Sequence, residues 1–286
     1  MKKFQVAIIL MLFITPIHSF AEPKPDMDVH FIDVGQGDSI LIETPSGKTI
    51  LIDGGPPEAG DKVVNYLKDK EIREIDLLIA THPDFDHIGG LVKVMKSIEV
   101  KQILDTGKVH LTRSFAKYVS EIRKQKIPTK IAKKNQRIRI DRELRIKVLN
   151  SQNDNNSNNE SSIVLKISYD DIDFLLMGDV KMEQERSLME KYDISADIIK
   201  VAHHGSDTST SLAFLEYVKP QIAILTYRVG NDYGHPVERV IENLERIDAN
   251  IYSTAAYGDV VIKTNGYDYF VFPKRSPSEN ILRKTS

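Results

Sequence analysis

Short segments with the two-residue period of β-strands alternate along most of the chain with segments that have the helical spacing of apolar residues. Three β-branched segments, 28–34, 39–43 and 49–52, are separated by turns rich in Gly, Ser and Pro, which predicts an antiparallel meander. A helix is then expected over 61–70 and a wholly apolar strand over 75–80. This alternation restricts the chain to folds in which helices pack on sheets.

The same two patterns continue to the C-terminal part of the chain. Further helices are expected over 90–97, 111–126, 183–192, 211–218 and 237–246. Further strands are expected over 102–104, 137–140, 144–149, 163–167, 173–177, 198–202 and 222–226, followed by three closing strands that reach Phe272. The Asn-rich stretch 150–159 is expected to be a surface loop. Sheets with helices on one side, twice over, predict an α/β fold, a four-layered αββα sandwich in a single domain.

The composition excludes several classes of protein. The chain has 28% charged and 41% hydrophobic residues, which rules out a disordered or collagen-like chain. It contains no Cys, so disulfides, thiolate metal sites and Cys nucleophiles are excluded. Any metal ion must therefore be held by nitrogen and oxygen ligands.

The first 21 residues have the pattern of a secretory signal peptide. Lys2 and Lys3 precede an apolar run over 6–17, and Ser19 and Ala21 are small residues at the positions that signal peptidase reads. A membrane anchor is the alternative, but the run is shorter than the roughly 20 residues that span a bilayer. We expect residues 1–21 to be removed and residues 22–286 to form a secreted, extracellular domain without stable membrane insertion.

Metal-ligand side chains gather directly after the apolar strand over 75–80. The next seven residues, 81–87, contain His82, Asp84, Asp86 and His87. They lie off the C-terminal end of that strand, where α/β sheets place their ligands. The alternative, in which His and Asp only cap a helix, explains one or two of these residues but not four. The segment therefore predicts a site that serves two metal ions.

Two other strand ends carry residues of the same kind. Asp179 follows Gly178 after one predicted strand, and His203 and His204 follow another. Taken alone, an Asp after Gly is usually a turn residue, and a His pair often belongs to a solvated loop. Because all three segments follow predicted strands, we expect their side chains to meet at one end of the fold.

The chain resembles the metallo-β-lactamase superfamily, and in particular the extracellular hydrolase domain of the competence DNA-uptake channel proteins. The resemblance runs in family order from residue 28 to about residue 272. It rests on segments 33–39 (DVGQGDS), 51–55 (LIDGG), 82–90 (HPDFDHIGG), 178–179 (GD), 203–206 (HHGS) and 233–236 (YGHP).

The resemblance implies an αββα hydrolase domain over residues 22–286 with two divalent metal ions. It assigns His82 and Asp84 to the first metal, Asp86, His87 and His204 to the second, and Asp179 to both. It also implies that Asp53 supports the ligand loop. His203 is expected beside the ligands, with an exchange of roles between His203 and His204 left open, and Ser206 and Tyr233 are expected near the metals or the substrate.

The first metal position departs from the pattern of the superfamily. Asp84 stands where a second His is usual, and Asn159 or a neighbour replaces another His. A site with one imidazole and more oxygen ligands is harder, which favours Mn²⁺ alongside Zn²⁺. The competence-type hydrolases share these departures. A degenerate relative that binds no metal is the alternative.

The implied chemistry is hydrolysis by a metal-activated water, and two metal ions suit the in-line displacement of a phosphodiester. Asp86 is the candidate to orient or deprotonate the water. His235 is the candidate to protonate the leaving oxygen or to bind a phosphate; the alternative is a His at a helix start beside an N1 proline, Pro236.

The segment 123–145 suggests the kind of substrate. It contains ten Lys and Arg residues but two acidic ones, so it is a candidate surface for nucleic acid. The alternative is a strand edge that positive charge protects from aggregation. The favoured function is a secreted metal-dependent phosphodiesterase acting on nucleic acid or another phosphate polymer. The alternatives are a β-lactam or lactone hydrolase acting on a small molecule, and a non-enzymatic polyanion- or wall-binding protein.

Overall fold

The computed structural model describes residues 24–151 and 157–277. The predicted signal peptide, residues 1–21, lies outside the described residues, as does part of the predicted surface loop 150–159. Within the two described ranges, no helix is both long enough and apolar enough to cross a membrane.

The first sheet has eight strands in the order β17-β16-β1-β2-β3-β5-β7-β8. Its strands are β1 (Met27–Phe31), β2 (Ile40–Glu43), β3 (Thr49–Ile52), β5 (Leu77–Ala80), β7 (Ile103–Asp105), β8 (Thr129–Ile131), β16 (Val260–Thr264) and β17 (Tyr269–Pro273). The predicted meander is confirmed, because β1, β2 and β3 pair antiparallel. From β3 through β8 the strands pair in parallel, so the C-terminal ends of these four strands share one edge of the sheet.

The second sheet has seven strands in the order β15-β14-β13-β12-β11-β10-β9. Its strands are β9 (Arg137–Ile138), β10 (Leu144–Asn150), β11 (Val164–Tyr169), β12 (Ile172–Leu176), β13 (Ile198–Lys200), β14 (Ile222–Leu225) and β15 (Asn250–Ser253). Strands β12 to β15 are parallel. A separate pair, β4 (Glu74–Ile75) and β6 (Glu99–Val100), lies outside both sheets.

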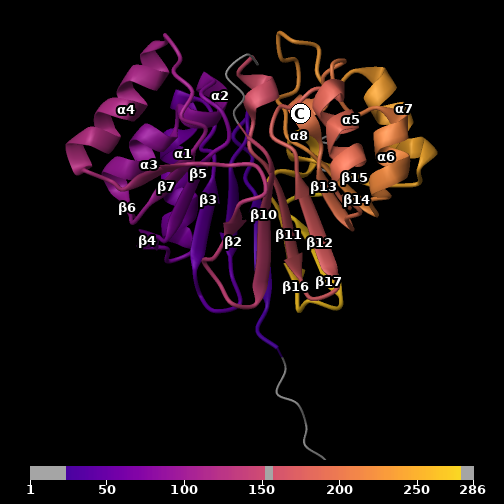
Figure 1. Ribbon diagram of the computed structural model, residues 1–286, viewed down its shortest axis with the longest axis horizontal. Coiled ribbons are helices and arrows are strands. Elements are labelled where there is room, and N and C mark those ends of the chain that lie inside the picture. The colour runs from indigo at the N-terminus through magenta and orange to yellow at the C-terminus, as the bar shows by residue number, and fades with distance from the viewer. Residues whose placement is uncertain (1–23, 152–156, 278–286) are drawn as a thin grey trace, which may run out of the picture.

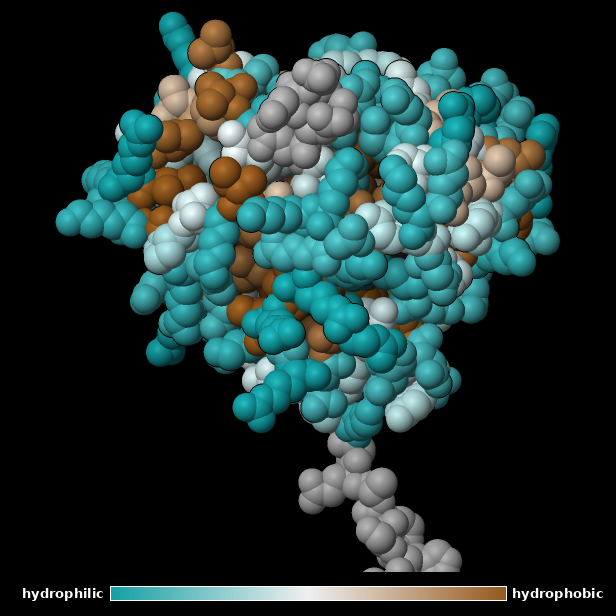
Figure 2. Space-filling model, viewed as in Figure 1, coloured by the Kyte–Doolittle hydropathy of each residue, from teal (hydrophilic) through white to brown (hydrophobic). Residues whose placement is uncertain are grey.

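Helices cover the outer face of each sheet (Figure 1). The first sheet packs against α1 (Gly60–Asp69), α3 (Leu91–Ser97) and α4 (Arg113–Gln125), and the second against α5 (Met182–Lys191), α6 (Leu212–Val218) and α7 (Glu238–Arg246). The short elements are α2 (Phe85–Ile88), α8 (Thr254–Tyr257), η1 (Pro57–Ala59), η2 (Asn159–Ser161) and η3 (Ala202–Gly205). The predicted αββα sandwich is confirmed, and its surface in this view is mainly hydrophilic (Figure 2).

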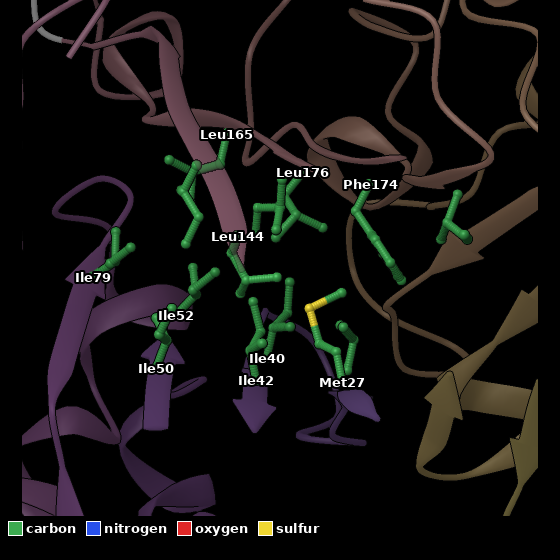
Figure 3. Close-up of a cluster of buried hydrophobic side chains, with 14 of the residues drawn as sticks. Met27, Ile40, Ile42, Ile50, Ile52, Ile79, Leu144, Leu165, Phe174 and Leu176 are labelled. Carbon is green, nitrogen blue, oxygen red and sulfur yellow. The ribbon is translucent and has the colours of Figure 1, made fainter. Parts of the chain in front are cut away.

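The largest apolar core lies between the two sheets. Ile40 and Ile42 of β2 point into it, whereas Leu41 between them packs under the helices of the first sheet. Figure 3 shows side chains of the first sheet, such as Ile52, facing side chains of the second, such as Leu176. Because alternate residues of a strand point to opposite faces, the same strands supply side chains to the core between the sheets and to the cores under the helices.

Two predicted strands end differently from expectation. The strand predicted over 75–80 is divided because the carboxylate of Asp76 accepts hydrogen bonds from the Thr49 backbone N–H at 3.0 Å and from Lys48 Nζ at 2.9 Å. The strand predicted over 198–202 ends at Lys200, because the chain turns at once into η3. The short strands β4, β6 and β8 have too few residues for periodicity to reveal them.

The burial of two phenylalanines predicts that they differ greatly in their contribution to the free energy of unfolding. Phe174 in β12 is fully buried there, while Phe270 in β17 is 64% exposed. We expect Phe174→Ala to lower the free energy of unfolding by about 3–5 kcal/mol, through lost burial and a residual cavity. The control Phe270→Ala should change it by less than about 1 kcal/mol. Urea unfolding of both variants is the measurement, and equal midpoints would contradict this description of the core.

Candidate metal centre

The predicted ligands come from strand ends of both sheets. His82, Asp86 and His87 follow β5 of the first sheet, while Asp179 and His204 follow β12 and β13 of the second. The parallel strands place these ends at one side of the sandwich, beside α2 (Figure 1). The site therefore lies across the seam between the two sheets.

Three imidazoles surround the carboxylate of Asp179. Its Oδ2 atom lies 3.3 Å from His87 Nε2, 3.6 Å from His204 Nε2 and 3.8 Å from His82 Nε2. A fourth imidazole, that of His203, also has its Nε2 atom 3.8 Å away. The structure thus brings together residues that are far apart in the sequence, with Asp179 at their centre.

The donor atoms form two overlapping sets. His82, His87 and Asp179 have donor atoms within 4.8 Å of one another, and so do Asp86, His87 and His204. The second set matches the residues assigned to the second metal. Asp84 Oδ2 lies 3.5 Å from His82 Nε2, on the side of the first metal. Two neighbouring cations are the simplest occupants of such overlapping sets.

The side chains of this cluster fit divalent cations. His82, His87 and His204 are at most 1% exposed, and their Nε2 atoms have no hydrogen-bond partner. The Oδ1 atom of Asp179 is also buried without one. Leaving buried polar atoms unpaired costs free energy, and a cation among these nitrogen and oxygen atoms would remove that cost. Imidazole and carboxylate donors of this kind are ligands of zinc and of manganese.

Asp53 fixes the ligand loop that follows β5. Its carboxylate accepts hydrogen bonds from the Thr81 backbone N–H at 2.8 Å and the Thr81 hydroxyl at 2.6 Å. The Asp53 carboxylate also contacts His87, with 2.8 Å between Oδ2 and Nδ1. Because Nδ1 is engaged there, the Nε2 atom of His87 faces Asp179. Carboxylates commonly orient metal-binding imidazoles in this way. Asp53 lies where the resemblance implies.

His204 is fixed by residues that sequence reasoning missed. Its Nδ1 atom lies 2.8 Å from the backbone carbonyl oxygen of Thr226. The Thr226 hydroxyl donates to Asp38 Oδ1 at 2.5 Å, and Asp38 Oδ2 lies 2.8 Å from Lys200 Nζ. One feature of the sequence points to this ion pair, namely a single Lys, Lys200, within the apolar strand 198–202. A buried Lys needs an anionic partner.

The first metal position is bordered by Asn158, a neighbour of Asn159 as the sequence analysis left open, and by His110, which was not predicted. Asn158 Nδ2 donates to Asp84 Oδ1 at 2.6 Å and lies 3.2 Å from His110 Nδ1. His110 Nε2 in turn lies 3.7 Å from Asp84 Oδ1. The predicted Asn159 contacts His203 instead, with 3.1 Å between Nδ2 and Nε2. An amide or imidazole outside the recognised motifs gives no pattern by which a sequence reveals it.

Tyr233 and His235 line the pocket over the site, whereas Ser206 does not. The ring of Tyr233 stacks on His235 at 5.7 Å, and His235 meets His203 edge to face at 5.4 Å. Ser206 is buried, with its hydroxyl 3.1 Å from that of Thr208. The alternative role of His235 at a helix start is wrong in its detail, because α7 begins at Glu238 and Pro236 is therefore not its first residue.

The buried charges in the cluster stabilise one another. Burial alone would lower the pKa of His87, but the carboxylates of Asp179 and Asp53 hold it well above its usual value. The pKa of His204 is also raised, because Asp179 and Asp86 outweigh its burial. Burial would raise the pKa of Asp179, yet His87 and His204 hold it well below the usual range. Without metal, a proton on His87 therefore offsets the charge of Asp179 near pH 7, and His204 keeps its proton to a higher pH than a free imidazole does.

The groups at the edge of the cluster titrate differently. Burial would raise the pKa of Asp84, but His82 and Asn158 lower it to about 2. Burial lowers the pKa of His203 to about 4, and it also lowers the pKa of His235. Near pH 7 the mouth of the site thus presents neutral imidazoles, beside a carboxylate that stays ionised.

These pKa shifts predict that metal binding releases protons. At pH 7 a cation has to displace protons from His87 and His204, so apparent affinity should rise with pH until both imidazoles are neutral in the metal-free protein. Calorimetric titration with Zn²⁺ or Mn²⁺, in buffers of different ionisation enthalpy, measures the protons released. An affinity that does not depend on pH between about 6 and 8 would contradict this charge balance.

Comparison with known families and relatives agrees with this geometry. The profile described as "Metallo-beta-lactamase superfamily" matches residues 32–227. ComE operon protein 3 of Bacillus subtilis (strain 168) is 31% identical over 273 residues, which are 88% of this chain and 34% of that protein. Competence protein ComA of Neisseria gonorrhoeae is 27% identical over 242 residues, 82% of this chain and 32% of that protein. The chain thus spans about a third of the length of these two relatives.

A solved structure shows the same fold. Zn(2+)-bound PqqB from Methylobacterium extorquens superposes with a TM-score of 0.51 at 10% sequence identity, over 78% of this chain and 97% of that one. The profile match covers more than half of the chain, and both relatives are similar over most of it. The resemblance to competence proteins is confirmed, and this chain belongs to the metallo-β-lactamase superfamily.

Proposed function

We propose that this chain is a secreted, metal-dependent phosphodiesterase that acts on nucleic acid or another phosphate polymer. The coarser assignment, a metal-dependent hydrolase, rests on its superfamily and on the two donor sets. Secretion rests on the signal-peptide pattern of residues 1–21.

The size of the pocket over the donor sets is the observation that favours a phosphodiester. The pocket has a volume of about 200 Å³, below the roughly 300–1,000 Å³ of pockets that enclose a whole small molecule. A tetrahedral phosphoryl group fits into such a space while the rest of a polymer stays outside. An enclosed bicyclic substrate such as a β-lactam needs more room.

The lining of the pocket supports the same chemistry. Divalent cations bound there supply Lewis acidity, which lowers the pKa of water and offsets the charge of a phosphate. Asp86, whose pKa is lowered because the His204 and His87 imidazoles outweigh its burial, is an ionised carboxylate at the pocket. It accepts a proton from water or holds the water by a hydrogen bond.

His235 binds the substrate on the opposite side of the pocket. Its lowered pKa makes it a neutral imidazole near pH 7, so it donates an N–H hydrogen bond to a phosphate oxygen more readily than it gives up a proton. Its ring is held between those of Tyr233 and His203. Of the two roles predicted for His235, we therefore propose phosphate binding.

Nucleic acid is the polymer that a relative and the charge pattern support. One relative carries the name of a competence protein. The chain itself has the excess of basic residues between positions 123 and 145. A substrate with one charge per phosphate is attracted by such a surface.

Chelation and removal of one ligand test the proposed activity. We expect hydrolysis of bis(p-nitrophenyl) phosphate that EDTA abolishes and that Mn²⁺ or Zn²⁺ restores. His82→Ala should remove this activity, because the first donor set then loses one of its two imidazoles. Activity that survives the substitution would refute the assignment.

Nitrocefin and acyl-lactone assays test for the two other hydrolases. For a non-enzymatic binding protein, metal analysis of protein purified without chelator would return no stoichiometric ion.

Replacement of His235 tests its role apart from metal binding. Because His235 lies outside both donor sets, His235→Ala, which removes the N–H donor, should keep the metal content of the wild type. We expect kcat/KM for the diester to fall by about 10- to 100-fold, the effect of losing one charge-assisted hydrogen bond to phosphate. Metal content by atomic absorption and steady-state kinetics are the measurements. An unchanged kcat/KM would exclude His235 from substrate binding.

A further inference from the structure

The basic segment 123–145 does not form one continuous surface. Arg123 and Lys124 lie on α4, which covers the first sheet, whereas Arg137 and Arg145 lie on β9 and β10 of the second sheet. Figure 1 shows α4 far from β10, on the outside of the other half of the sandwich. The segment as a whole is therefore not one candidate surface, because the chain crosses from one layer to another within it.

Three cations stand in a row across β9, β10 and β11. The strand register places Arg137 opposite Lys147, and Lys147 opposite Lys166. Neighbouring strands are about 4.8 Å apart, so the row is roughly 10 Å long. Like charges directly opposite each other on a sheet are destabilising. The requirements of the fold alone therefore do not explain this arrangement.

The row lies on the face of the second sheet that points away from the inter-sheet core, where Arg137 is exposed and Lys147 and Lys166 are half-buried. Ile138, Ile146 and Ile167 point into the inter-sheet core, so the residues that alternate with them point outward. The row borders a groove of about 470 Å³ that also contains Arg139, Arg142 and Arg145. In Figure 2 hydrophilic side chains gather over the region of β10, around smaller apolar areas.

The positive charge of this groove is only partly balanced. Lys166 Nζ lies 3.0 Å from Asp173, and Lys147 Nζ lies 4.7 Å from the ring centroid of Tyr192. Within the described ranges, Arg137 and Arg145 form no ion pair. The carboxylate in the groove, that of Asp141, instead accepts hydrogen bonds from Ser46 and the Glu143 backbone N–H.

Protection of a sheet edge does not account for the row. Positive charge on an edge strand hinders edge-to-edge pairing, and β9 is the edge of the second sheet. However, Lys147 and Lys166 lie on β10 and β11, which have a neighbour on both sides. Lys166 is balanced by Asp173, whereas a ligand with closely spaced negative charges explains Arg137 and Lys147, with Arg145 beside them.

We propose that Arg137, Lys147 and Lys166, with Arg145 beside them, form a cation row that binds the phosphate backbone of duplex nucleic acid. The proposal rests on the proposed phosphodiesterase function and locates the part of the substrate that the small pocket cannot hold. A duplex carries one charge per about 1.7 Å of its axis, so the roughly 10 Å of the row spans several phosphate charges. The row itself contains no aromatic residue on which unpaired bases would stack, which favours a duplex over a single strand.

The cation row is connected to the metal centre through β10. Lys147 and Asn150 are three residues apart on this strand, which is about 10 Å. Asn150 Nδ2 donates to the backbone carbonyls of Glu160 and Ser162. The same turn carries Asn158, which contacts Asp84 at the first metal position. One duplex is therefore long enough to contact both the cation row and the pocket.

A charge-matched pair of variants tests the cation row. The row variant is Arg137→Gln, Arg145→Gln and Lys147→Gln, and the control is Lys117→Gln, Arg123→Gln and Lys124→Gln on α4. Fluorescence anisotropy of a labelled duplex two helical turns long, measured with metal withheld, gives affinity between about 50 and 200 mM salt. Thermal melting of both variants checks that they fold.

We expect the row variant to bind the duplex roughly tenfold more weakly, with a salt slope shallower by about 2.7 for three lost contacts. The control should bind like the wild type. Equal losses in the two variants, or no loss in either, would overturn the proposal. Tighter binding of a teichoic acid in competition would also overturn the assignment to nucleic acid. The result does not depend on cleavage, so failure of the proposed phosphodiesterase activity appears separately in the diester assay.

If the row variant does not fold, charge reversal at one exposed position replaces it. Arg137→Glu changes one exposed residue of the edge strand, and Lys124→Glu is its control on α4. The first should weaken duplex binding and the second should not. Equal binding by the two single variants would refute the cation row.

Discussion

An ion pair without access to water joins the two sheets beside the metal centre. Asp38 belongs to the connection between β1 and β2 of the first sheet, and Lys200 belongs to β13 of the second. Their side chains are 2% and 0% exposed, with 2.8 Å between the charged atoms. Loss of either partner would leave a buried charge alone, which costs about 3–5 kcal/mol. Because the donor sets draw residues from both sheets, their geometry depends on this contact.

The ion pair also compensates for a strained backbone at the ligands. His203 and His204 have φ values of 50° and 55°, in the left-handed region that L-residues avoid. Such conformations cost about 1–3 kcal/mol each and persist only where surrounding contacts fix them. The carbonyl oxygen of Thr226 contacts Nδ1 of the His204 ring, and the hydroxyl of Thr226 donates to Asp38. These contacts hold the His204 ring on the side away from Nε2. This strain keeps the Nε2 atom of His204 turned toward Asp179.

The sequence reveals what is periodic or local, and this includes most of the fold and the ligands. The four layers follow from strand and helix periods, and His82 to His87 follow from their place after an apolar strand. Lys200 was missed because one Lys in a strand resembles a solvent-facing residue, and its partner Asp38 lies far away in the chain. Asn158 was covered by the expectation of Asn159 or a neighbour, whereas His110 was missed because only the fold brings it to Asp84.

The small pocket has a consequence for specificity. A space of about 200 Å³ admits the phosphoryl group that all phosphate polymers share, so contacts inside it cannot distinguish one polymer from another. Discrimination must arise on surfaces that the rest of the substrate reaches. Residues that are neighbours in sequence, such as those of α4 and β9, lie on different surfaces, whereas Lys147 and Lys166 lie opposite each other on adjacent strands. In the proposed phosphodiesterase, substrate choice would thus depend on strand register, which a basic composition alone does not disclose.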